Sequence, residues 1–297
     1  MILSKAILAI SSLIVLTSEE VSLSNAEYSF EAESYYLPDS VLSSLCHDKH
    51  FSYCSKRGIA SIGISLSSYN KHKKSTDYSK KLLYAGLEYF NFGCSNGDGE
   101  SCYNLGVSYE SVPSLFPLTP ASKEISNSYY NRSCELGYAP ACRVSGNLIS
   151  LKKSSPKQTL LAKSFFEKGC ELGDSSSCNL AGALTFKTSP SHHAKALSLP
   201  YYRYSCLMGD KDGCFQYALM LVSSNNHDNF RKAISPLKSS CEAGNSLACY
   251  ILGMSYLEGI GCKRDLEISS LLFRKACSLG DKNACSENTH NPLSLSR

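Results

Sequence analysis

The sequence predicts an all-α protein, a solenoid of about seven αα-hairpins with one disulfide in each hairpin. Two observations carry this prediction. Fourteen of the 15 cysteines form pairs spaced Cys-x7-Cys, and from the third pair onward the pairs recur every 35 or 36 residues. Glycine, small and large apolar residues also recur in fixed register with these pairs. A repeat at such a period is typical of solenoids, in which each unit buries its apolar face against its neighbours.

The N-terminus predicts export. After Lys5, residues 6–16 are uncharged and mostly apolar, and Ser24-Asn25-Ala26 has small residues at the positions that a signal peptidase reads before Glu27. We therefore expect a signal peptide at residues 1–26, a lead segment at 27–37, the repeat domain at 38–288 and a tail at 289–297. The apolar run is short for a transmembrane span of about 20 residues, so we expect no span, with an uncleaved anchor as the alternative.

Composition agrees with an exported protein. Fifteen cysteines in 297 residues are many for a compartment that keeps thiols reduced. The predicted location is therefore secreted or periplasmic. A net charge of +4 gives no indication of nucleic-acid binding. No phosphate loop, dinucleotide fingerprint or metal motif on a helix is present, so we expect no cofactor.

The first helix of each hairpin is predicted upstream of the first cysteine. Residues four and eight positions before this cysteine share its helical face. The residue at eight is small, and the residue at four is large and apolar: Phe90, Tyr130, Phe166, Tyr202, Leu237 and Phe273. This spacing favours a helix that buries one stripe and ends near the cysteine.

The turn and the second helix follow from the next positions. Glycine lies three residues after the first cysteine in six units and is predicted to end the first helix in a left-handed conformation. Asp or Asn often follows and can cap the second helix, which the second cysteine opens. A small residue four positions later is expected to let the two helices approach closely.

The paired cysteines thus flank the turn of each hairpin, where a disulfide has suitable geometry. A zinc site stays open as an alternative for the first pair, because His47 and His50 lie between Cys46 and Cys54. The other pairs lack such histidines, so disulfides are expected for all seven: Cys46–Cys54, Cys94–Cys102, Cys134–Cys142, Cys170–Cys178, Cys206–Cys214, Cys241–Cys249 and Cys277–Cys285.

Cys262 lies outside the repeat register, in the glycine-rich stretch at residues 257–265. An unpaired cysteine in an exported protein is a buried thiol, an interchain bridge or a reactive group. We expect a partly buried free thiol in a monomer, with a disulfide-linked dimer through Cys262 as the alternative.

The repeat resembles the Sel-one-like helical repeat, which is related to the TPR. The resemblance spans about residues 38–288 and rests on the C-x2-G-x4-C spacing and on stretches such as 162–182 and 252–261. It is similar to the disulfide-rich branch called the Helicobacter cysteine-rich proteins. The resemblance implies a right-handed superhelix with one disulfide per repeat, a role in protein interaction, and in this branch penicillin binding or weak β-lactamase activity.

A catalytic set for β-lactam hydrolysis is not assembled in the sequence. Serine β-lactamases place a Ser one helical turn before a Lys and add Ser-Asp-Asn and Lys-Thr-Gly motifs. Ser235 and Lys238 have the first spacing, but neither companion motif occurs. We therefore predict no catalytic residues and no metal site.

Neighbouring aromatic residues on the first helices suggest a binding groove. Successive helical residues point about 100° apart, so one ring of each pair is core and the other faces the groove or packs between repeats. The expected groove residues are Tyr89, Tyr129 and Tyr201, with polar neighbours Asn131, Lys168, Arg203 and Arg274. The favoured function is an exported scaffold for a peptide, protein or peptidoglycan-like fragment. The alternative is a β-lactam-binding protein with weak hydrolase activity.

Overall fold

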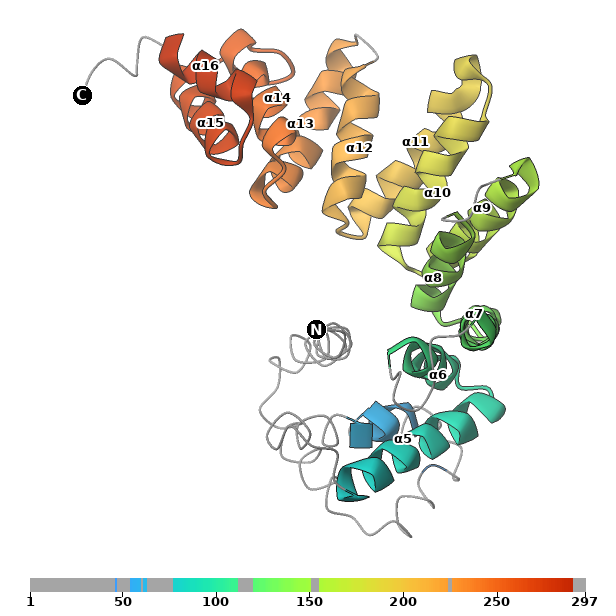
Figure 1. The fold of residues 1–297 in the computed structure, drawn as a ribbon. Coiled ribbons are helices and arrows are strands. Elements are labelled where there is room, and N and C mark those ends of the chain that lie inside the picture. Colours follow the sequence, from blue (N-terminus) through green and yellow to red (C-terminus); the bar gives the residue numbers. More distant parts are fainter. Residues whose placement is uncertain are drawn as a thin grey trace. The chain divides into compact units, whose positions relative to one another are not determined.

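The computed structural model describes residues 46, 54–59, 61–62, 77–111, 120–150, 155–223 and 226–290, and the regular structure in these ranges is entirely helical. The chain divides into two compact units, residues 1–148 and 149–297 (Figure 1). The predicted signal peptide and lead segment lie outside the described residues, as does most of the tail. None of the described helices is long and apolar enough to cross a membrane.

Two hairpins lie in the described part of unit 1. Helices α5 (Asp77–Ser95) and α6 (Gly99–Ser111) form one, and α7 (Pro120–Glu135) and α8 (Ala139–Ser150) form the next, with the unit boundary in the last turn of α8. Helical residues at 46 and 54–59 precede them and carry the first cysteine pair. Helices α6 and α7 pack against each other, so that successive hairpins stack.

The described residues of unit 2 form four hairpins, which stack in order along the chain (Figure 1). Within each hairpin one helix leads into the turn and the other leaves it, and we call these the first and second helices. The hairpins are α9 (Pro156–Glu171) with α10 (Ser175–Thr188), α11 (Ser191–Leu207) with α12 (Lys211–Val222), α13 (His227–Glu242) with α14 (Ser246–Glu258), and α15 (Leu266–Ser278) with α16 (Lys282–His290).

In the hairpins with Asp or Asn after the glycine, the turn uses two connected caps, as the α9–α10 turn illustrates, whereas the α7–α8 turn has Tyr138 at that position. Gly173 has a φ of +95° and donates its N–H to the Cys170 carbonyl, while Asp174 donates its N–H to the Gly169 carbonyl. These two bonds satisfy the last carbonyls of α9. The Asp174 carboxylate then accepts the N–H of Ser177 and caps α10. One glycine and one Asp or Asn therefore reverse the chain, as the sequence predicts.

In each of the six described hairpins a disulfide joins the two helices across the turn, and Cys46 is bridged to Cys54 at the same spacing. All seven predicted pairs are bridged, and their Cα atoms lie 4.2 to 5.4 Å apart. The second cysteine lies one turn inside the second helix rather than at its start, because the Asp or Asn cap begins that helix earlier. The bridge between Cys46 and Cys54 replaces the zinc alternative for this pair, and His47 and His50 lie outside the described residues.

The small residue of the second helix packs against the next hairpin, not against its own first helix. A Cβ added to Gly253 would lie 2.8 Å from Cε1 of Phe273, and one added to Gly106 would lie 2.7 Å from Cε1 of Tyr130. Each ring belongs to the first helix of the following hairpin. The glycine thus makes room for the large core residue that the sequence places four positions before the next first cysteine.

Buried serines add hydrogen bonds between neighbouring hairpins. Ser205 donates to the Ser175 carbonyl at 2.8 Å, and Ser240 donates to the Lys211 carbonyl at 2.6 Å. Each serine directly precedes a first cysteine, and each carbonyl lies at the start of the preceding second helix. Because these hydroxyls are buried and satisfied, they fix the register in which one hairpin sits on the next.

Candidate functional site

The first helices of unit 2 each have one face turned away from the core. Positions four and eight before the first cysteine are buried in α9, α11, α13 and α15. Positions two, three, six and nine before it lie toward the opposite side of the helix. We call the surface made by these positions in α9, α11, α13 and α15 the first-helix face of unit 2.

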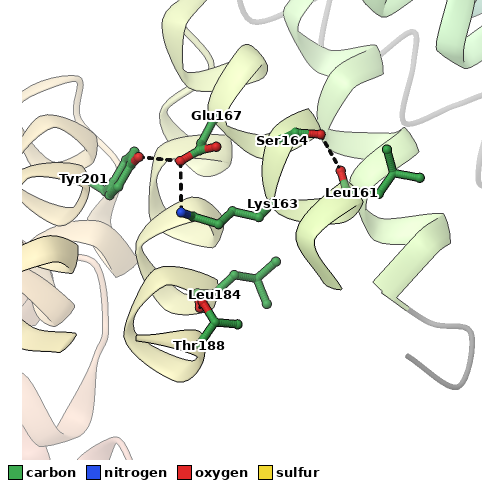
Figure 2. Close-up of polar contacts among 7 residues, drawn as sticks. All are labelled: Leu161, Lys163, Ser164, Glu167, Leu184, Thr188 and Tyr201. Carbon is green, nitrogen blue, oxygen red and sulfur yellow. Dashed lines mark hydrogen bonds and ion pairs between the residues drawn. The ribbon is translucent and has the colours of Figure 1, made fainter. Parts of the chain in front are cut away.

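One hydrogen bond connects Glu167, a residue of this face, to the neighbouring first helix (Figure 2). The Tyr201 hydroxyl of α11 donates to the Glu167 carboxylate of α9 at 2.6 Å, and the Lys163 ammonium lies 3.3 Å from the same oxygen. Burial, followed by the hydrogen bond to Glu167, raises the pKa of Tyr201 to about 12. Tyr201 also packs on the core around Phe166. The ring therefore lies between repeats, which is one of the two placements that the sequence allows.

Large apolar side chains are exposed in register on the same face. Nine positions before the first cysteine, Leu161 of α9 is 49 % exposed, Leu197 of α11 is 51 % exposed and Ile268 of α15 is 38 % exposed. The equivalent residue of α13 is the exposed Lys232. Scattered exposed apolar residues need no explanation, but a row in register across stacked hairpins is typical of an interaction surface.

Helix α11 also carries a shallow depression. Its lining residues are largely apolar and lie one helical turn apart, and they include Leu207, which is 73 % exposed. The lining consists of Leu199, Pro200, Arg203, Tyr204 and Leu207. Sequence reasoning found only Arg203 in this set. Leu207 could have been identified from the sequence, because it departs from the repeat. The residue after the first cysteine is Ser or Glu in the hairpins of α5, α7, α9, α13 and α15.

Arg203, Lys238 and Arg274 occupy one register position on α11, α13 and α15, three residues before the first cysteine. All three side chains are exposed. None of them has a hydrogen bond or ion pair with any residue that the structure describes. The predicted site residue Lys168 is partly buried on α9, one position further along the register, and likewise has no such partner.

The predicted groove residues of unit 1 lie on α5 and α7. Tyr89 and Tyr129 are partly buried, and Asn131 is exposed. The Tyr129 ring stacks on Tyr109 of α6, with centroids 5.7 Å apart. Tyr129, like Tyr201, therefore packs partly between hairpins. Tyr129 and Asn131 lie on the same helix, α7.

No hydrogen bond joins Ser235 and Lys238, the pair with the serine-hydrolase spacing, and both lie exposed on α13. No group of three or more His, Cys, Asp or Glu side chains suited to a metal occurs within the described ranges. Cys262 is the cysteine left outside the seven bridges, and burial raises the pKa of its partly buried thiol.

The sequence model of the Sel1 repeat family matches residues 99–138, 153–174 and 246–281. The first and last of these segments each pair a second helix with the first helix of the next hairpin, α6 with α7 and α14 with α15. The glycine–ring contacts of Gly106 and Gly253 therefore lie inside single Sel1 repeats. No curated protein sequence matches the chain.

Solved structures share the fold at low identity. A protective antigen of uropathogenic Escherichia coli, c5321, with an SLR fold, is 18 % identical over 83 % of this chain, with a TM-score of 0.56. This chain covers only 52 % of that antigen. A Sel1 repeat protein from Oxalobacter formigenes is 18 % identical over 69 % of this chain and 86 % of its own, with a TM-score of 0.53. These similarities establish the Sel1-type helical fold.

The cysteine-rich protein B of Helicobacter pylori is 20 % identical over 57 % of this chain and 98 % of its own. Its TM-score of 0.24 is too low to add to the fold assignment.

Proposed function

We propose that this chain, which carries Sel1 repeats, is an interaction scaffold whose first-helix face of unit 2 binds a peptide or a protein segment. The observation that carries the proposal is the exposed row Leu161, Leu197 and Ile268, which lies in register on three first helices. The other recurring positions serve the turn, the disulfide or the contact between hairpins. This row has no such role within the described fold.

The energetics favour a ligand with apolar side chains. Fully burying a Leu or Ile stabilises by about 1.5–3 kcal/mol, so covering the exposed half of each side chain contributes about 1 kcal/mol. Three such contacts, with the depression on α11, can support a specific complex. A peptide supplies apolar groups at the required spacing, whereas a sugar polymer supplies few. We therefore favour a peptide over a purely saccharide cell-wall fragment.

The disulfides support an oxidising compartment as the site of action. Seven bridges persist outside the cytosol, where thiols are not kept reduced. The proposed location is the periplasm or the extracellular space, in keeping with the signal peptide expected at residues 1–26. The hydrolase alternative gains no support from Ser235 and Lys238, because both are exposed and no hydrogen bond joins them.

A displayed library of random peptides tests the proposed function. The folded chain with its disulfides intact is immobilised, and selected peptides are synthesised and titrated by fluorescence anisotropy. We expect Leu197→Ser to weaken binding about five- to tenfold, since tenfold corresponds to about 1.4 kcal/mol. The matched control is Phe186→Ser on the second helix α10, where the side chain is 44 % exposed.

The control variant should bind like the parent chain. Recovery of no binding peptide, or equal losses in Leu197→Ser and Phe186→Ser, would overturn the proposed function.

A further inference from the structure

Cations recur at one register position along the proposed binding face. Arg203, Lys238 and Arg274 lie three residues before the first cysteine on consecutive first helices, α11, α13 and α15. The equivalent residue of α9 is Glu167. The Tyr201 contact shows where this position points, because Tyr201 of α11 reaches Glu167 of α9. In α11 and α13 this position therefore lies toward the next first helix, whereas Arg274 occupies it on α15, the last first helix that the structure describes.

The acidic groups nearby leave this row positive. Glu167 is already engaged by the Lys163 ammonium and by the Tyr201 hydroxyl. Glu171 and Glu242 lie one turn further toward the ends of α9 and α13, and neither forms an ion pair with a described residue. Lys238 is four residues before Glu242, yet their charged groups do not lie within ion-pair distance. The three cations are therefore available to a ligand.

Arg203 connects the row of cations to the apolar depression. It lines that depression together with Tyr204 and Leu207 of the same helix. The exposed Leu197 lies on α11 as well. A ligand on α11 thus meets an apolar surface and a guanidinium side by side. A guanidinium favours a carboxylate, which it can bind through two parallel hydrogen bonds.

We propose that the first-helix face of unit 2 recognises an acidic peptide segment in which carboxylate and apolar side chains alternate. The carboxylates pair with Arg203, Lys238 and Arg274, and an apolar side chain occupies the depression on α11. This inference rests on the proposed function and specifies its ligand.

A peptide fits these features better than a nucleic acid or an anionic polysaccharide. Nucleic-acid sites place many cations along the phosphate backbone, and those for single strands add aromatic rings on which bases stack. Here each of three hairpins contributes a single cation at this position, and the neighbouring groups on α11 include aliphatic side chains. An apolar side chain beside a carboxylate matches both features, and amino acids supply that combination.

Three synthetic probes of equal length test the inference with the full disulfide-bonded chain. In the first, Leu alternates with Asp; in the second, Asn replaces Asp; in the third, Lys replaces Asp. Dissociation constants are measured by fluorescence anisotropy at low and high salt. Each exposed pair should contribute a factor of about two to three, so the Asp peptide should bind about tenfold more tightly than the Asn peptide. High salt should reduce that difference.

The test variant combines Arg203→Gln, Lys238→Gln and Arg274→Gln. It should bind the Asp and Asn peptides equally. The charge-matched control combines Lys187→Gln, Lys263→Gln and Lys282→Gln, which removes three exposed lysines outside the first helices. This control should keep the tenfold preference.

Three results would overturn the inference. These are equal binding of the Asp and Asn peptides by the parent chain, equal behaviour of the two triple variants, and tighter binding of heparin or single-stranded DNA than of the Asp peptide. The proposed function fails separately, when the random library yields no binding peptide. Library peptides that bind without acidic enrichment overturn only this inference.

Discussion

The contact between Gly253 and the Phe273 ring predicts that two substitutions will compensate each other. Gly253→Ala would place a Cβ 2.8 Å from Cε1 and 2.9 Å from Cδ1 of the ring. The neighbouring hairpin supplies the natural comparison. There the small residue is Ala218, and the large residue of the next first helix is Leu237 rather than an aromatic residue. Ala with Leu should therefore be compatible where Ala with Phe is not.

The magnitudes come from packing and helix propensity. Gly253→Ala gains about 1 kcal/mol of helix propensity. Forcing a methyl group into a packed core costs about 1–3 kcal/mol, so we expect a net loss of about 1 kcal/mol. Phe273→Leu alone removes ring atoms and leaves a cavity, at a cost of about 1–2 kcal/mol. In the double variant the added methyl group fills part of that cavity, which predicts a favourable coupling of about 1–2 kcal/mol.

The assay is urea unfolding of the four chains of this double-mutant cycle, with disulfides intact. The coupling energy follows from the midpoints, provided that the slopes stay equal. Ala218→Gly is the reverse control, because it removes a methyl group where Gly253→Ala adds one. It should destabilise the chain, because it leaves a cavity and introduces a flexible residue. If Gly253→Ala raises the free energy of unfolding by about 1 kcal/mol, as propensity alone requires, and the coupling is near zero, the packing argument is wrong.

Three further predictions concern the disulfide bridge, the turn and the tyrosine between α9 and α11. Replacing both Cys170 and Cys178 by Ser should lower the free energy of unfolding by about 2.5 kcal/mol, from chain entropy for a closed loop of nine residues. The control Cys262→Ser should change the free energy of unfolding by less than about 0.5 kcal/mol. Equal effects of the two replacements would contradict the role of the bridge. Gly244→Ala should cost about 1–2 kcal/mol in thermal or urea unfolding, because Gly244 has a φ of +95°; an unchanged stability would refute this. Tyr201 should keep its proton in the folded chain up to a pH of about 12. Its contribution to stability is therefore complete below the unfolded phenol pKa of about 10 and disappears between about pH 10 and about pH 12. In an ultraviolet titration, Tyr201→Phe should lose a phenol that titrates at about pH 12, and loss of one that titrates at about pH 10 would contradict the assignment.

The hairpins and their bridges were predictable because their causes are local. A glycine that needs a positive φ, an Asp or Asn cap and two cysteines all act within one turn, and each leaves a fixed spacing in the sequence. The helical face of Phe273 was predictable for the same reason, since a helix places residues four apart on one side.

Contacts between hairpins were harder to predict, because they depend on which residues meet across the stack. The sequence shows a small residue at Gly253, but a small residue is needed there because the Phe273 ring, 20 positions later, packs against it. Likewise, the sequence shows Ser240 only as a small residue, and the structure shows that its hydroxyl donates a hydrogen bond to the Lys211 carbonyl. A comparison of register positions does reveal the pairing, because Ala replaces Gly in the hairpin whose neighbour supplies Leu237.

The candidate site was only partly predictable. Arg203 and Arg274 were expected on the first helices, and both are exposed there. Tyr201 was expected to face a groove or to pack between repeats, and its ring is partly buried against the preceding hairpin. Leu197 and Leu207 were missed, because an apolar residue on an amphipathic helix reads as core unless its register is compared with that of the other hairpins.

The central claim is that a ligand binds across the first helices of unit 2. Hydrogen–deuterium exchange of the full chain, with and without a saturating peptide selected from the library, tests it most directly. We predict that the peptide slows exchange in α9, α11, α13 and α15 and leaves α10, α12, α14 and α16 unchanged. Protection concentrated in the second helices, or no protection at saturation, would contradict the claim.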